Sequence, residues 1–143
     1  MFSKANKKAQ VSMEYMIIIG FSLMVIIPII VLATNYSTDY SYKFKSYQAQ
    51  KAADIFTKIS DELFFEGYPS KRTIKVYIPD NIKDSYIINK TIVFELRQKN
   101  DIIKVYSTAE YANMSFENKV ENSGYLTFEL YHAINDTIVI KKK

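Results

Sequence analysis

The chain has 143 residues, which is enough for one domain of modest size. It contains no cysteine, so a disulfide framework and a thiolate metal site are both excluded. The formal net charge is +4, but three lysines lie in the first nine residues and three more form the C-terminal tail. The rest of the chain is near neutral, and no basic stripe for nucleic acid is expected.

An uncharged apolar run dominates the N-terminal part of the chain. Residues 15–33 carry no charge, and at 1.5 Å per residue these 19 positions form about 28 Å of helix, close to the ~30 Å hydrocarbon core of a bilayer. Pro28 predicts a kink in this helix. A cleaved secretory signal would have a shorter apolar region and a small-residue cleavage site, which Ala33 and Thr34 do not supply. A plain signal anchor remains an alternative.

Glu14 stands directly before this run. A carboxylate in lipid costs roughly 2.5–3.5 kcal/mol near the centre of a helix and less toward its end. If the chain is cut between Ala9 and Gln10, the new α-amine lies about one helical turn from Glu14. The amine of one copy could then neutralise the carboxylate of a neighbour that is staggered by a small axial step. This spacing indicates a filament subunit.

The residues around this point resemble a known signal. A Lys-rich leader, the motif Gln10-x-Ser12-x-Glu14 and an apolar helix follow one another, as in the class III signal peptide of archaeal type IV pilins. The resemblance covers about the first quarter of the chain, and Ile18 stands where the family often has Leu. It implies that a prepilin peptidase removes the basic leader, residues 1–9, between Ala9 and Gln10. It also implies that residues 10–34 first span the membrane and then pack in a filament core, with Glu14 as the assembly residue.

The same resemblance implies a location and a set of partners. The precursor would be anchored in the membrane with its N-terminus inside and its C-terminus outside, which the basic leader also favours. After cleavage it would join an extracellular surface filament. The implied partners are copies of itself and other pilins, the prepilin peptidase, the pilus assembly machinery and, before assembly, the membrane. No nucleic acid and no cofactor are expected.

A hinge and an amphipathic helix are expected over residues 35–67. Residues 35–41 form helix poorly and could be a hinge, a membrane-surface segment or a weak part of one continuous helix. Three tyrosines in and beside this segment suggest an interfacial aromatic belt: Tyr36, Tyr40 and Tyr42. Apolar residues then recur at helical spacing: Phe44, Ala52, Ile55, Phe56, Ile59 and Leu63. Gly67 and Pro69 supply a stop, and the helix should pack on a sheet.

Residues 70–143 are predicted to form an extracellular β domain. Apolar and polar residues alternate over 73–78 and 125–131, while residues 86–96, 102–108 and 137–140 are also typical of strands. Residues 110–123 read as a loop with one short strand near 114–116. The sequence therefore predicts an α+β fold, in which a long N-terminal apolar and amphipathic helix precedes a small, mostly antiparallel domain of five or so strands. This layout is type IV pilin-like.

Four sequons suggest an exported surface. Asn-x-Ser/Thr occurs at four of the nine asparagines, where the Ser and Thr content predicts about 1.3 by chance. The possible N-glycosylation sites are Asn35, Asn89, Asn113 and Asn135. Turn chemistry alone also produces such triplets. The resemblance adds that archaeal pilins are often glycosylated.

Residues suited to catalysis or metal binding are scarce. His132 is the only histidine and lies in a predicted strand, where a surface or pairing role is commoner than a basic catalyst. Asp61 and Glu62 are interpreted as the solvated face of the helix, and the acids show no metal-loop spacing. No catalytic residue, metal site or enzymatic activity is predicted.

The sequence thus favours a structural subunit of an archaeal type IV pilus-like filament. One alternative is a minor pilin that primes assembly or caps the tip. A second is a monomeric, signal-anchored surface protein that binds something outside, and this protein would need neither cleavage before Gln10 nor Glu14. An archaellin shares the same assembly logic and is a third.

Overall fold

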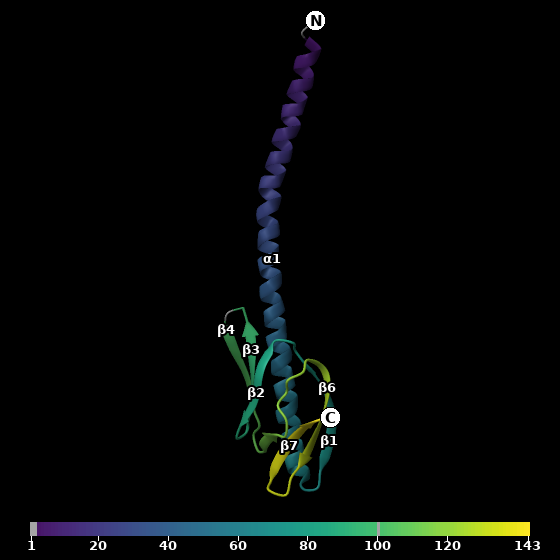
Figure 1. The fold of residues 1–143 in the computed structure, drawn as a ribbon, viewed down its shortest axis with the longest axis vertical. Coiled ribbons are helices and arrows are strands. Elements are labelled where there is room, and N and C mark those ends of the chain that lie inside the picture. The colour runs from purple at the N-terminus through teal and green to yellow at the C-terminus, as the bar shows by residue number, and fades with distance from the viewer. Residues whose placement is uncertain (1–2, 100) are drawn as a thin grey trace. The chain divides into compact units, whose positions relative to one another are not determined.

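A computed structural model describes residues 3–99 and 101–143, with side chains described from Gln10 onward. Its single helix, α1 (Ser3–Glu66), contributes to two compact units that are described separately here (Figure 1). We call the unit up to Ser41 the stem and the unit Tyr42–Lys143 the head. Of the leader, residues 1–2 and the side chains of residues 3–9 lie outside the described part.

The stem is helical throughout its described length, including residues 35–41. Of the three alternatives for that segment, the structure shows continuous helix. Pro28 lies inside the helix and removes one backbone N–H donor. Hydroxyl groups within the stem donate to their own backbone carbonyls, as Ser22 does to Ile18 at 2.8 Å and Thr38 does to Thr34 at 3.0 Å. These bonds let polar side chains lie in an apolar helix without an outside partner.

The head consists of the last part of α1 and seven strands. The strands are β1 (Lys71–Ile78), β2 (Ile82–Ile88), β3 (Thr91–Gln98), β4 (Asp101–Thr108), β5 (Asn113–Phe116), β6 (Gly124–His132) and β7 (Thr137–Lys142). They form a four-stranded sheet in the order β1-β6-β7-β5 and a three-stranded sheet in the order β2-β3-β4. All pairs are antiparallel except β5 with β7. The predicted α+β layout, a long apolar N-terminal helix followed by mostly antiparallel sheets, is confirmed and is like that of a type IV pilin.

Both sheets pack on α1 around one core. The helix presents small buried residues, including Ala49, Ala53 and Ser60, which let the strands approach closely. Phe56 is fully buried and meets the ring of Phe128 from β6 edge-on, with 5.0 Å between centroids. On the side of the three-stranded sheet, hydrogen bonds join α1 to β4, for example between the hydroxyls of Thr57 and Ser107 at 3.1 Å. In Figure 1, β4 and β1 mark the two outer edges of this arrangement.

The predicted strand over residues 86–96 is wrong, because the chain reverses within it. β2 ends at Ile88 and β3 begins at Thr91, so Asn89 and Lys90 form a tight hairpin turn. Asn89 has a positive φ of 55°, a conformation that asparagine tolerates better than most residues. The expected reversal near residues 98–101 is present between β3 and β4, although Asn100 lies outside the described residues.

Three polar contacts fix the segments around the end of α1. The helix ends with Gly67, which has a φ of 75° and donates its N–H to the carbonyl of Leu63 at 3.1 Å, an αL-type cap. Arg72 at the start of β1 pairs with Glu62 and Glu66 on the helix. These pairs hold the first strand against the last turns of α1.

Asp61 holds the start of the segment that the sequence predicts as a loop over residues 110–123. Its carboxylate accepts hydrogen bonds from the backbone N–H groups of Glu110, Tyr111 and Ala112, each at 2.9 Å. Asp61 and Glu62 are half-exposed, as expected of a solvated helix face, but both carboxylates also have partners. Asp61 anchors a loop, and Glu62 pairs with Arg72.

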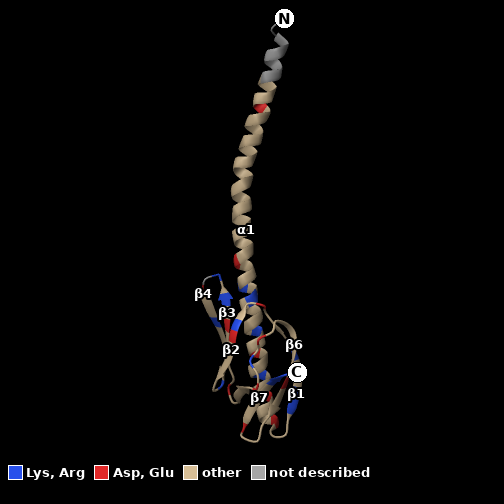
Figure 2. Cartoon of the chain, viewed as in Figure 1, with Lys and Arg blue, Asp and Glu red and all other residues tan. Residues whose placement is uncertain are grey.

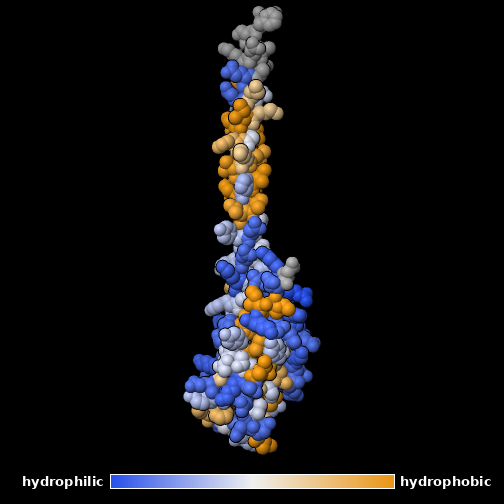
Figure 3. Space-filling model, turned by 90° about the vertical axis from the view of Figure 1, so that its left-hand side faces the viewer, coloured by the Kyte–Doolittle hydropathy of each residue, from blue (hydrophilic) through white to orange (hydrophobic). Residues whose placement is uncertain are grey.

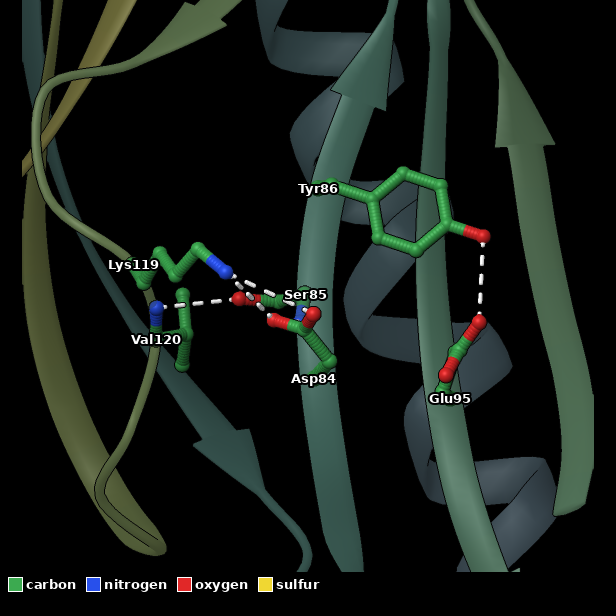
Figure 4. A network of polar contacts seen from close by, with 6 residues as sticks. All are labelled: Asp84, Ser85, Tyr86, Glu95, Lys119 and Val120. Carbon is green, nitrogen blue, oxygen red and sulfur yellow. Dashed lines mark hydrogen bonds and ion pairs between the residues drawn. The ribbon is translucent and has the colours of Figure 1, made fainter.

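A second network ties β2 to the loop after β5 (Figure 4). The buried Ser85 hydroxyl accepts the N–H of Val120 at 3.0 Å, and Lys119 pairs with Asp84 at 3.1 Å. Lys119 and the N–H of Ser85 both donate to the Asp84 carboxylate and hold its pKa below its ordinary value. These bonds join the loop between β5 and β6, two strands of the four-stranded sheet, to β2 of the three-stranded sheet.

Candidate assembly surface

The stem has an apolar surface that nothing in the structure covers. Every residue over 10–41 is exposed. Large apolar side chains occupy positions 16–19, 23–27 and 29–32, and only Pro28 separates the last two runs. Figure 3 shows the apolar band that they form on the stem. Because successive helical residues are rotated by about 100°, such runs cover the full circumference. A helix that is apolar all round requires an apolar environment.

This helix is long and apolar enough to cross a membrane. Its most apolar stretch is 0% buried, which separates it from the core helix of a soluble domain. Between Gln10 and Ser41 the only charged residues are Glu14 and Asp39, and the helix between them is uncharged (Figure 2). The coarser prediction of a long apolar N-terminal helix that could anchor the chain in a membrane is therefore confirmed.

Simple energetics favour burial of this helix despite Glu14. Residues 15–33 contain twelve Leu, Ile, Phe and Val residues. On insertion scales these contribute together about 4 to 7 kcal/mol in favour of the membrane. The carboxylate opposes insertion by roughly 2.5–3.5 kcal/mol at most, since it lies near one end. The apolar surface outweighs the charge, but the charge remains a local cost that a partner could remove.

Two of the three signal residues share a face of the helix. Gln10 and Glu14 are four residues apart and lie one turn apart on that face, whereas Ser12, two residues from each, lies on the opposite side; all three are exposed. Within the described part of the chain, no basic side chain lies at ion-pair distance from Glu14. The backbone is helical across the expected cut between Ala9 and Gln10, and the side chain of Ala9 lies outside the described residues.

The four sequon asparagines are all exposed. Asn35 lies within the stem helix, Asn89 is in the turn between β2 and β3, Asn113 begins β5, and Asn135 is in the turn between β6 and β7. Exposure is a condition for glycosylation, and glycosylation itself stays a prediction. Asn35 differs from the other three because its backbone is helical.

His132 is packed among other side chains of the head. It is the last residue of β6, is buried, and packs beside the ring of Phe64. Its Nε2 lies 3.3 Å from a carboxylate oxygen of Asp136, four residues later in the turn. No cluster of His, Asp and Glu suited to a metal ion occurs among the described residues.

Sequence reasoning missed one surface feature of the head. A groove of about 600 Å³ lies between α1 and strands β1 and β6. Phe44, which we expected to share the packed face of the helix, is instead half-exposed at this groove. Helical spacing could not separate Phe44 from the core positions because it also falls on the apolar side of the helix.

The chain matches no protein-family model, no curated protein and no solved structure. Three features of the chain itself bear on its function. These are the exposed apolar stem, the carboxylate of Glu14 at its start, and the motif Gln10-x-Ser12-x-Glu14.

Proposed function

We propose that this protein is a structural subunit of an archaeal type IV pilus-like surface filament. The observation that carries the proposal is the stem, which is apolar on every side and fully exposed in the single chain. A membrane can cover this surface in the precursor, and stems of other copies can cover it in a filament. Glu14 favours the filament because a membrane offers a carboxylate no partner.

Assembly would follow from the removal of residues 1–9. Cleavage by a prepilin peptidase before Gln10 creates an α-amine one helical turn from Glu14. In a partly apolar bundle, opposite charges about 4 Å apart attract by roughly 4 kcal/mol at an effective dielectric constant of about 20. This is comparable with the cost of placing the Glu14 carboxylate in an apolar core, so a neighbour's amine could offset that cost.

The proposal includes an orientation and a set of contacts. The basic leader would keep the N-terminus inside the cell, and the head would lie outside before and after assembly. Copies of this chain and other pilins would contact the stem, and the assembly machinery would act in the membrane. The exposed sequons of the head would then be available for N-glycosylation.

Three alternatives share part of this logic. A minor pilin or an archaellin would use the same stem and cleavage but differ in abundance or in filament type. A monomeric signal-anchored surface protein would use the stem only as a membrane anchor. The last alternative predicts an uncleaved chain that stays in the membrane and whose location does not depend on Glu14.

The test measures the intact mass and N-terminal peptide of the protein from membranes and from sheared surface material. We expect a chain that begins at Gln10 in the sheared fraction. Glu14→Ala should still insert in the membrane, but its yield in sheared filaments should fall at least about tenfold because the pairing energy is lost. Glu121→Ala, which changes an exposed carboxylate of the head, is the matched control and should assemble normally.

Two results would contradict the proposal. One is a chain that begins at Met1 and is confined to membranes. The other is Glu14→Ala assembling into filaments as well as the unchanged protein does.

A further inference from the structure

The groove of the head is built from one face of α1 and from the edge of the four-stranded sheet. β1 is the outermost strand of that sheet, and β6 is its neighbour. Aromatic and basic side chains from these elements line the groove: Phe44, Tyr47 and Lys51 from α1, Lys75 and Tyr77 from β1, and Tyr125 from β6. All of them belong to the head, so the groove is a feature of one compact unit.

Most aromatic side chains of this groove are open to solvent. Phe44 is 51% exposed, Tyr47 is 65% exposed and Tyr125 is 71% exposed. Tyr77 and Tyr125 contact each other at a centroid distance of 5.1 Å, which fixes the strand side of the groove. A cluster of exposed apolar side chains of this kind often marks an interaction site.

Two lysines, Lys51 and Lys75, give the groove a positive charge. Most ion pairs of the head join a lysine to a nearby carboxylate, as in Lys45 with Asp80 at 2.7 Å and Lys104 with Glu95 at 3.0 Å. Lys75 lies over the ring of Tyr125, and neither it nor Lys51 has a carboxylate at ion-pair distance among the described residues. The groove lining contains no acid. Its chemistry fits a partner that has aromatic groups beside a carboxylate.

The stem offers such a partner. Tyr36 and Tyr40 are one helical turn apart and are 74% and 72% exposed. Asp39 stands beside Tyr40, is exposed, and is the only carboxylate in the stem after Glu14. This short segment therefore has the aromatic content and the charge that complement the groove.

We propose that the groove of one copy receives the stem of a second copy around Tyr36, Asp39 and Tyr40. This inference rests on the proposed filament function and identifies a second contact within it. The groove includes Phe44, which lies three residues after the end of the stem on the same helix. The proposed contact would therefore extend the buried surface of the filament from the stem onto the head. An interface of this kind joins head to stem between copies, and because it is heterologous it propagates instead of closing a dimer.

Crosslinking tests the contact directly because the chain has no cysteine of its own. The pair Gln48→Cys and Ser37→Cys places one thiol in the groove and one beside the face of the stem that carries the two tyrosines. A short bismaleimide applied to sheared filaments should give a ladder of covalent multimers, since each copy contributes both partners. Each single variant should give dimers at most. The control pair Ser37→Cys with Asn118→Cys uses an exposed head residue outside the groove and should give no ladder.

Charge exchange tests the chemistry. Lys51→Glu combined with Lys75→Glu should lower filament yield about tenfold, since two partly exposed ion pairs together contribute about this factor. Adding Asp39→Lys should restore part of the yield, which a merely structural defect would not allow. Lys58→Glu with Lys71→Glu, two exposed head lysines outside the groove, is the matched control and should assemble normally.

The outcomes separate this inference from the proposed function. If filaments form and depend on Glu14 but the groove pair gives no more multimers than the control pair, this inference alone is wrong. Normal assembly of the lysine variants with lost adhesion to an acidic polysaccharide would also overturn it, in favour of an external ligand. If the unchanged chain is absent from sheared filaments, the proposed function and this inference fail together.

Discussion

The stem and the head use the same helix in opposite ways. Over the stem, α1 exposes every described side chain from Gln10 onward, and its apolar residues point in all directions. Over the head, the same helix buries one face, where Phe56 and Leu63 are fully enclosed by the sheets. The head therefore completes its core within one chain, whereas the stem leaves its apolar surface for a membrane or for other copies.

The distribution of charge follows the same division. From Gln10 to Ser41 the stem has two carboxylates, Glu14 and Asp39, and no basic residue, whereas the head distributes both signs over many ion pairs (Figure 2). In the head, charge fixes loops and strands on the surface. In the stem, each carboxylate is placed where a second molecule can reach it. The comparison teaches that a residue's role depends on which of the two environments surrounds it.

The same substitution in the two units should break different properties. Phe56→Ala removes the ring that meets Phe128 in the core, so we expect the free energy of unfolding of the head to fall by about 3–5 kcal/mol. Phe21→Ala, at an exposed stem position, should change it by no more than about 0.5 kcal/mol. Thermal unfolding of the detergent-solubilised chain measures both. Equal losses of stability would show that the two units do not differ as described.

Loss of the Asp61 carboxylate should give the next largest effect. Asp61→Asn leaves one oxygen to accept bonds that three backbone N–H groups now make, and we expect a loss of about 2 kcal/mol of head stability. Asp54→Asn is a matched control because Asp54 is an exposed carboxylate on the same helix. Denaturant unfolding compares the two variants. A control that loses as much stability as Asp61→Asn would exclude a specific role for the loop anchor.

Loss of the Glu95 carboxylate should give the smallest effect on the stability of the head, and this effect should depend on pH. Hydrogen bonds from Lys104, and to a lesser extent from Tyr86 (Figure 4), hold the pKa of the Glu95 carboxyl below its ordinary value of 4.5. A carboxyl whose pKa is lower in the folded state adds stability above the unfolded pKa and loses it as the pH falls through the folded pKa.

The thermal unfolding midpoint of the unchanged head should therefore exceed that of Glu95→Gln near neutral pH. This difference should shrink as the pH is lowered below about 4.5. A difference that grows on acidification would contradict the role assigned to Glu95. Filament yield at neutral pH should be the same for both proteins, because Glu95 lies outside the stem and the groove.

Several parts of the fold could be predicted because local pattern decides them. The length of the uncharged run predicts the apolar helix, and Gly67 predicts the end of α1. The alternation of apolar and polar residues predicts β1 and β6. The hairpin at Asn89 could not be found this way, because residues 86–96 are apolar and β-branched on both sides of the turn. The turn depends on the positive φ of Asn89, which the pattern of apolar and polar residues does not indicate.

The sequence by itself determined the signal motif, the apolar stem and the α+β layout, since each follows from the order and spacing of neighbouring residues. The tertiary structure alone decided that Asp61 anchors a loop 49 residues away and that Phe44 faces a groove instead of the core. It also brought Lys51 and Lys75 to one surface without a carboxylate beside them. Those features arise from contacts between distant segments, and local spacing carries no information about which segments meet.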